Sequence, residues 1–140
     1  MPGAVPHEAE ADVLRANAAF YAAFSEGDLA AMSALWAEDS PIACFHPGSA
    51  GLFGRADVLD SWRQILRPRP PFVMRCDRPR VQFLGDAAVV ACYEANGDRP
   101  AHLAATNVFV LEGGRWRLAH HQAGPLAAPL PKPAAPSTFN

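Results

Sequence analysis

The 140-residue sequence predicts an α+β domain in which three helices precede a curved antiparallel β-sheet and cover one of its faces. Two observations carry this prediction. Apolar residues recur at helical spacing in the first half of the chain, whereas alternating strand patterns separated by turn sequences fill the second half. Helices followed by strands are typical of an α+β fold. A sheet wrapped around helices gives a cone-shaped domain with space for a ligand between the two layers.

Three helices are expected in order. The first runs from about residue 7 to residue 25 and ends at Gly27, and Asp28 is a good N-cap for a short second helix. The third runs from about residue 55 to residue 66, where three prolines in the next five residues stop it. The stripe of the first helix that faces inward consists of Val13, Asn17, Phe20, Tyr21 and Phe24.

The strands follow from alternation and turn residues. A short strand is expected over residues 40–46, followed by a Pro-Gly loop. A longer strand over residues 72–84 bends at Arg78-Pro79, and the next covers residues 87–94. We assign residues 7–125 to a single domain and residues 1–6 to a disordered leader. Residues 126–140 are assigned to a flexible tail, because the chain from Pro125 onward contains five prolines in sixteen residues.

The last two strands form a hairpin between residues 101 and 125, with Gly113-Gly114 as its two-residue turn. Counting outward from this turn pairs Phe109 with Leu118, Asn107 with His120 and Thr106 with His121. Because side chains alternate along a strand, two faces result. The inner face then carries Leu111, Phe109, Asn107, Trp116, Leu118 and His120, and the outer face carries Thr106, Val108, Val110, Ala119 and His121.

Composition excludes several classes of function. A formal net charge of −2 and the lack of a basic run argue against nucleic-acid or membrane-surface binding. Three cysteines without CxxC spacing indicate reduced thiols, and no apolar stretch approaches the ~20 residues that span a bilayer. Without a signal-peptide pattern, a cytoplasmic location is expected. Neighbouring His120 and His121 point to opposite faces, so no metal site and no cofactor are predicted.

Several segments resemble the nuclear transport factor 2-like superfamily, which includes ketosteroid isomerase, SnoaL-type polyketide cyclases and scytalone dehydratase. The resemblance lies in Glu26-Gly27-Asp28-Leu29, in Leu35-Trp36-Ala37-Glu38-Asp39 and in Thr106-Asn107-Val108-Phe109. The segment Cys44-Phe45-His46-Pro47-Gly48, with Gly54 and Ser61-Trp62, is similar to a SnoaL-like subgroup. The resemblance implies the cone-shaped fold and a homodimer formed through the outer sheet face.

The acids of ketosteroid isomerase are absent from the matching positions. Its tyrosine falls on Phe20, beside Tyr21; its base falls on or near Cys44; and its protonated aspartate falls on Asn107. The resemblance therefore implies the scaffold without steroid isomerase activity, because one scaffold hosts many functions.

The sequence predicts a small-molecule-binding protein with an apolar cavity for an apolar or amphipathic ligand. One alternative is a cofactor-free isomerase, cyclase or dehydratase acting on a carbonyl compound. In it His120 or His46 is the acid or base, and Asn107 and Tyr21 polarise the oxygen. The other is a non-catalytic dimeric interaction module. Histidines near Asn107 in a closed pocket favour catalysis, and a pocket filled by Trp62 and Phe20 favours the module. The predicted pocket comprises Asn17, Phe20, Tyr21, Trp36, Cys44, Trp62, Phe109, Trp116 and Leu118.

Overall fold

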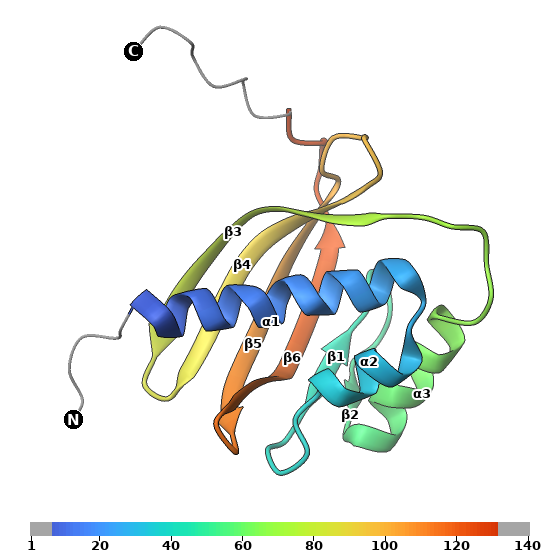
Figure 1. Ribbon diagram of the computed structural model, residues 1–140. Helices are drawn as coiled ribbons and strands as arrows, with labels where there is room; N and C mark the ends of the chain where they lie inside the picture. Colours follow the sequence, from blue (N-terminus) through green and yellow to red (C-terminus); the bar gives the residue numbers. More distant parts are fainter. Residues whose placement is uncertain (1–6, 132–140) are drawn as a thin grey trace, which may run out of the picture.

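The structure is a computed structural model that describes residues 7–131. The predicted leader and the last nine residues of the predicted tail lie outside this range. The helices are α1 (His7–Glu26), α2 (Leu29–Leu35) and α3 (Arg55–Ile65). The strands are β1 (Ala43–Phe45), β2 (Leu52–Phe53), β3 (Met74–Leu84), β4 (Ala87–Asn96), β5 (Leu103–Glu112) and β6 (Arg115–Pro125), which confirms the predicted α+β class (Figure 1).

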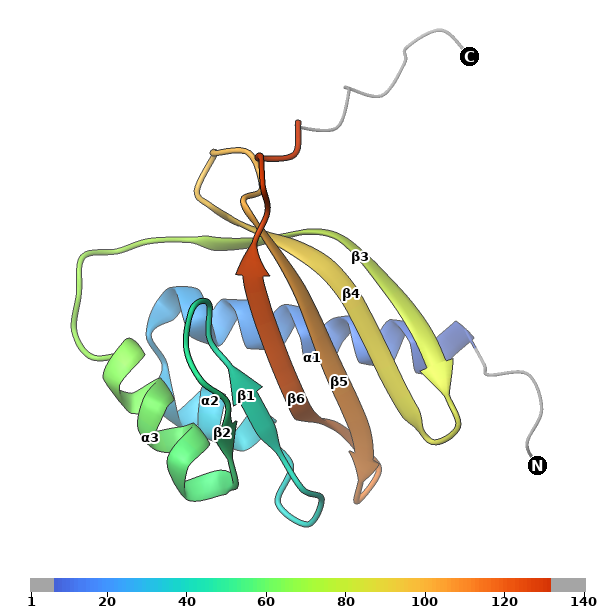
Figure 2. The same cartoon turned by 180° about the vertical axis from the view of Figure 1, so that it is seen from behind.

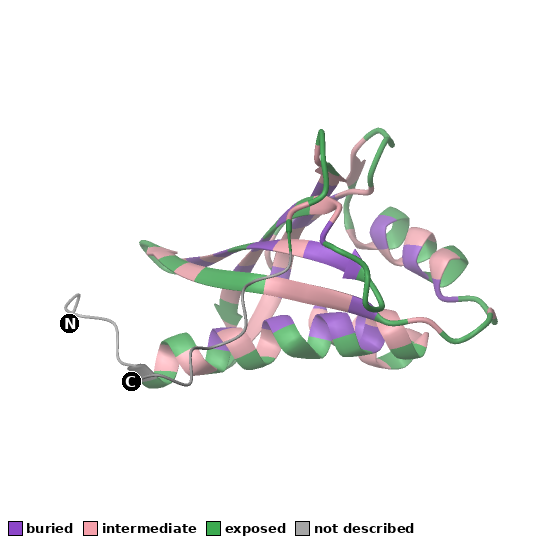
Figure 3. Cartoon of the chain, turned by 90° about the horizontal axis from the view of Figure 1, so that it is seen from above, coloured by how far each residue is buried: buried purple, intermediate pink, exposed green. Residues whose placement is uncertain are grey.

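The six strands form one sheet in the order β2-β1-β6-β5-β4-β3. Helix α1 crosses one face of this sheet, and no helix of residues 7–131 lies over the opposite face (Figure 2). Figure 3 shows the same two layers from above, with buried residues where they meet. None of the described helices combines the length and the apolar character needed to cross a membrane.

The sheet differs from the prediction at its β1 edge. Strand β1 pairs with β6 in parallel, whereas every other pair is antiparallel. No strand was predicted at the position of β2, because two residues are too short to give an alternating pattern. The long segment between β1 and β6 permits either orientation, so local sequence does not determine this pairing.

Local signals place the first two helices as predicted. Gly27 takes a φ of 69°, a conformation that favours glycine at the end of a helix. The Oδ1 of Asp28 accepts a hydrogen bond from the backbone nitrogen of Ala31 at 3.0 Å, which makes Asp28 the N-cap of α2. This sharp break turns the chain so that α1 and α2 cover the sheet together (Figure 1).

Strand β3 bends where the sequence predicted it. The pairing with β4 shifts between Asp77 and Arg80, and Arg78 takes a φ of 55° within this bulge. The guanidinium of Arg78 donates to the carbonyl of Pro131 at 2.6 Å. Two backbone hydrogen bonds, from Leu126 and Leu130, also hold the first residues after β6 against residues 101–102.

The hairpin register is confirmed near the turn and wrong beyond it. Phe109 pairs with Leu118 as predicted, but Ala119 is an extra residue that forms a β-bulge in β6. Asn107 therefore pairs with His121, and Val108 pairs with His120. Because a shift of one residue exchanges the two faces of a strand, His121 points inward and His120 points outward.

Candidate functional site

A buried polar cluster lies between α1 and the sheet, centred on Asn107. Its Nδ2 donates to Oδ1 of Asn17 at 2.8 Å and to the hydroxyl of Tyr21 at 3.1 Å. Its Oδ1 lies 2.5 Å from Nδ1 of His121. Tyr21 in turn donates to Oε2 of Glu94 at 2.7 Å. All five side chains are at most 4% exposed, so they satisfy one another rather than water.

The hydrogen bonds determine which ring nitrogen of His121 carries the proton. Since the Asn107 amide nitrogen is used by Asn17 and Tyr21, its oxygen must accept the proton on Nδ1 of His121. The other ring nitrogen, Nε2, lies 3.9 Å from Oε2 of Glu94. Burial lowers the pKa of His121 to about 3 and raises the pKa of Glu94. The imidazole is therefore neutral at physiological pH.

This geometry corrects two assignments made from the sequence. His120 was expected beside Asn107, but it lies on the outer face with its ring 5.8 Å from that of Phe45. His121 was expected on the outer dimer face, but it is 1% exposed and takes the inner position. The bulge at Ala119 is the physical reason for both errors.

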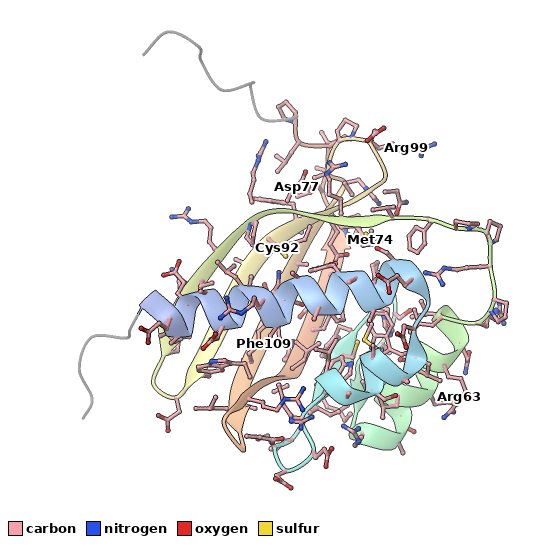
Figure 4. The ribbon with its side chains drawn as sticks, viewed as in Figure 1. Arg63, Met74, Asp77, Cys92, Arg99 and Phe109 are labelled. Atoms are coloured by element: carbon pink, nitrogen blue, oxygen red, sulfur yellow. The ribbon has the colours of Figure 1, made fainter. Side chains whose placement is uncertain are left out.

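Aromatic rings fill the space around the polar cluster. The ring of Phe20 packs edge-to-face on that of Trp62 at 5.5 Å and lies 4.9 Å from the ring of His121. Figure 4 labels Cys92 and Phe109 on strands that α1 crosses. Of the nine predicted pocket residues, eight lie in the core at 4% exposure or less: Asn17, Phe20, Tyr21, Trp36, Cys44, Trp62, Phe109 and Leu118. Contact of these residues with a ligand stays a prediction.

The ninth predicted pocket residue, Trp116, lies apart from this core. It is half-buried beside Phe83, with 6.0 Å between their ring centroids. The two rings line a surface pocket of about 720 Å³ at the ends of the two long hairpins, together with the exposed Leu111. The predicted inner face of the hairpin is therefore exposed to solvent near its turn, at Leu111 and Trp116.

His46 lies at a larger pocket of about 790 Å³, formed by α3, the segment between β1 and β2, and the residues that follow α3. Its Nε2 is 3.0 Å from Oγ of Ser61, and the Ser61 hydroxyl donates to the carbonyl of Val58 at 2.7 Å. The His46 ring also packs edge-on against Trp62 at 5.0 Å. Trp62 thus separates this pocket from the polar cluster.

Cys44 and His46 do not form a nucleophile pair, although the thiol sulfur is 3.6 Å from Nε2. Burial raises the pKa of Cys44 to about 12, so the group stays a thiol at neutral pH. Burial also lowers the pKa of His46, which keeps the ring uncharged. A neutral imidazole beside a solvent-accessible pocket is suited to accept a proton from a ligand. Within residues 7–131, no three His, Cys, Asp or Glu side chains are arranged to hold a metal ion.

Glu94 and Ser61 were not identified as site residues from the sequence. Glu94 shares its face of β4 with Ala88, Val90 and Cys92, all of which are buried. Period-two alternation from these apolar residues was the signal that would have placed this carboxylate inside. Ser61 carries no comparable signal, because its contact with His46 joins a helix to a strand end.

Comparison with known proteins agrees with the observed architecture. The profile of a family described as a SnoaL-like domain matches residues 13–128. Among solved structures, a protein of Streptomyces avermitilis provisionally assigned as a dehydratase of the NTF2-like family is 32% identical. Its TM-score is 0.79, and the match covers 89% of this chain and all of that chain (100%).

Two further relatives carry different descriptions. A Thiobacillus denitrificans protein, provisionally assigned as a calcium/calmodulin-dependent protein kinase type II association domain, is 38% identical. Its TM-score is 0.71, and the match covers 79% of this chain and 92% of that chain. The F-box protein SKIP8 of Arabidopsis thaliana is 25% identical over 111 residues, or 79% of this chain. The chain spans about half (48%) of the length of SKIP8.

Proposed function

The chain belongs to the SnoaL-like domain family, and from that premise we propose that it is a small-molecule-binding domain whose ligand contacts His46. The observation that carries the proposal is a neutral imidazole at a ligand-sized pocket. The pocket volume of about 790 Å³ falls within the range of roughly 300–1,000 Å³ that small-molecule sites occupy.

The lining of this pocket favours an amphipathic ligand. Leu52 and Ile65 offer apolar contact, whereas Ser49, Ser61 and Gln64 offer neutral hydrogen-bonding groups. The lining also contains two carboxylates and two guanidinium groups, from Asp57, Asp60, Arg67 and Arg69. Because both charges are present, the pocket has no strong preference for one ligand charge. A molecule with a hydroxyl or carbonyl group on an apolar frame fits this mixture.

The chemistry that His46 supports is proton transfer without a cofactor. The Ser61 hydroxyl is committed to Val58, so it accepts from Nε2 of His46 and leaves the other ring nitrogen as an acceptor. Removal of a proton next to a carbonyl group is the step that isomerisation, cyclisation and dehydration share. The relative provisionally assigned as a dehydratase supports this reaction class.

Because aromatic side chains fill the core, ligand binding is the primary proposal and catalysis is the secondary one. Phe20 and Trp62 are both 0% exposed, and this is the outcome that the sequence analysis tied to a non-catalytic module. The proposed site therefore retains His46 from the predicted set and moves the ligand from the apolar interior to the pocket beside α3.

Protein-observed NMR of the histidine rings and thermal shift, with a library of amphipathic hydroxy and carbonyl compounds, test the proposal. We expect at least one compound to raise Tm and to perturb the imidazole resonances of His46, and we expect His46→Gln to abolish the rise in Tm. His120→Gln is the matched control, because this histidine lies on the outer face. Binding that His46→Gln leaves unchanged, or a library with no binder, would overturn the proposal.

Self-association is a second candidate function, and the helix-free face of the sheet favours it. Ala104 and Thr106 are exposed there and Val108 is half-buried beside them, and within the described part of the chain no helix covers this face (Figure 2). A two-fold pair of such faces buries the same surface on both partners. The relative described as an association domain supports this reading.

Light scattering after size exclusion tests this second candidate. We expect twice the chain mass at micromolar concentration, and a single-chain mass for Thr106→Arg, which introduces charge in the middle of the face. Ala22→Arg is the control, because Ala22 is exposed on α1. A single-chain mass for the unmodified protein would contradict self-association.

A further inference from the structure

Two of the three cysteines lie on neighbouring strands and share the inner face of the sheet. Cys76 of β3 pairs with Glu94 of β4, and Cys92 lies two residues from Glu94 along the same strand. Residues two apart on a strand point the same way, so both thiols face α1. The register therefore places Cys92 diagonally opposite Cys76 on this face.

We propose that Cys76 and Cys92 form a peroxide-oxidisable thiol pair, which closes to a disulfide between β3 and β4. The pair is independent of the His46 pocket. All three cysteines are free thiols in the structure. Cys44 lies on β1, near the edge of the sheet opposite to β3 and β4. Cys44 therefore serves as an internal reference for a buried thiol that does not belong to the pair.

The backbone permits the closure with a small movement. Diagonal neighbours on antiparallel strands have Cα atoms about 7–8 Å apart. A disulfide accepts Cα separations up to roughly 7 Å, so a shift of about 1 Å is sufficient. Strand β3 is at the edge of the sheet, and its bulge begins directly after Asp77. An edge strand with a neighbouring bulge moves more easily than a strand paired on both sides.

The surroundings make Cys76 the thiol that reacts first. Hydrogen bonding from Cys92 lowers the pKa of Cys76, and the Asn17 amide adds a second hydrogen bond, with Nδ2 3.4 Å from the sulfur. Cys76 is half-buried, whereas Cys92 and Cys44 are buried. The hydrogen bond with Cys76 raises the pKa of Cys92, and burial raises the pKa of Cys44. The accessible thiol with the most thiolate character is the nucleophile.

The chemistry needs only hydrogen peroxide as oxidant. The Cys76 thiolate attacks one peroxide oxygen, the O–O bond breaks, and a sulfenic acid and water form after proton transfer. The Cys92 sulfur then attacks the sulfenic sulfur, the S–O bond breaks, and a second water leaves. Two thiols and one peroxide give one disulfide and two waters, so two electrons pass from the thiols to the peroxide.

Oxidation changes the polar cluster as well as the strands. The Asn17 amide donates to the Cys76 sulfur, and the Tyr21 hydroxyl lies 3.3 Å from the Cys92 sulfur. A disulfide sulfur is a poor hydrogen-bond acceptor and carries no proton to donate. The closed pair therefore loosens the attachment of α1 to β3 through Asn17 while it joins β3 to β4 covalently.

Intact-mass spectrometry of the full chain, after treatment with stoichiometric hydrogen peroxide, tests the proposal. We expect the loss of two hydrogen atoms, a non-reduced peptide that links Cys76 to Cys92, and reversal by dithiothreitol. In the reduced protein we expect iodoacetamide to label Cys76 more than about tenfold faster than Cys44. Cys44→Ser should behave like the unmodified protein.

Cys92→Ser supplies the second arm of the test. Without its partner, Cys76 should stop at the sulfenic acid and be trapped by dimedone, with circular dichroism checking that the variant is folded. If this variant is unfolded, Cys92→Ala replaces it. Oxygen addition to Cys76 without a disulfide in the unmodified protein would overturn the proposal, as would equal oxidation of Cys44.

Discussion

The Nδ1 atom of His121 lies 2.5 Å from Oδ1 of Asn107, and both side chains are closed to solvent. The same amide donates to Asn17 and Tyr21, so one side chain of β5 joins β6 to α1. Each of these partners is buried. The core of the domain therefore depends on a polar contact as well as on its aromatic packing.

Asn107→Ala should lower the free energy of unfolding by about 1–3 kcal/mol, because it leaves buried partners without hydrogen bonds. Urea denaturation measures the loss. Asn96→Ala, the same change at an exposed position of β4, is the control and should stay within about 0.5 kcal/mol of the unmodified protein. Equal effects of the two substitutions would show that the amide contributes nothing specific.

His121 should make the domain sensitive to acid. Its pKa is about 3 in the folded chain, against about 6.5 when unfolded, because burial disfavours the charged ring. Protonation thus favours the unfolded chain, and stability is complete above pH 6.5 and falls as pH decreases toward 3. Urea midpoints between pH 7 and 4 should fall less for His121→Gln than for the unmodified protein. The control His102→Gln, on the segment between β4 and β5, should keep the original slope.

Glu94 should make the stability of the domain fall as pH rises, which is opposite to the effect of His121. Burial raises its pKa in the folded chain, so its contribution to stability is present below the unfolded pKa of about 4.5 and is lost as pH rises through the folded pKa. Glu94→Gln keeps an acceptor for Tyr21 and removes the charge. Its urea midpoint relative to the unmodified protein should rise with pH, whereas Glu8→Gln, an exposed control, should give a constant difference. A constant difference for Glu94→Gln would contradict the assignment.

Local signals in the sequence were sufficient for the three helices, for the long strands and for part of the site. The Gly113-Gly114 turn predicted the pairing of Phe109 with Leu118, and Asp28 predicted the start of α2. The bulge at Ala119 has no glycine or proline to announce it, so the face of His121 was assigned wrongly. A bulge depends on how the whole strand fits its neighbours, and a pattern of alternation cannot contain that information.

Contacts between distant segments were the other missing information. His46 was identified as a candidate base from its residue type and its place at a strand end. Its contact with Ser61 and the pocket beside α3 depend on how β1 pairs in parallel with β6. That pairing joins segments more than seventy residues apart, and only the packed core determines it.

Phe20→Ala should lower the free energy of unfolding by about 3–5 kcal/mol, because it removes a fully buried ring from the aromatic core. The cavity would lie between Trp62 and His121, which the Phe20 ring now contacts. Benzene or indole should bind there and recover part of the loss in Tm. Phe53→Ala is the matched control, since that ring is 67% exposed, and it should show neither effect.

Glu112 should hold the hairpin turn against the segment that follows α2. Its carboxylate accepts hydrogen bonds from the backbone nitrogens of Glu38, Asp39 and Ser40, at 2.8–3.1 Å, and from the Ser40 hydroxyl at 2.8 Å. The hydrogen bond from Glu38 is the main reason that the pKa of Glu112 is lowered. Glu112→Gln replaces one accepting oxygen by a donor, so Tm should fall at pH 7.

The pH dependence of this loss distinguishes the carboxylate from simple packing. A lowered folded pKa gives stability that is present above the unfolded pKa of about 4.5 and is lost as pH falls through the folded pKa. The Tm difference between Glu112→Gln and the unmodified protein should therefore shrink as pH is lowered below 4.5. Glu26→Gln, an exposed control at the end of α1, should give the same small difference at every pH. A Glu112→Gln difference that persists or grows in acid would mean that the charge of Glu112 is not what anchors the turn.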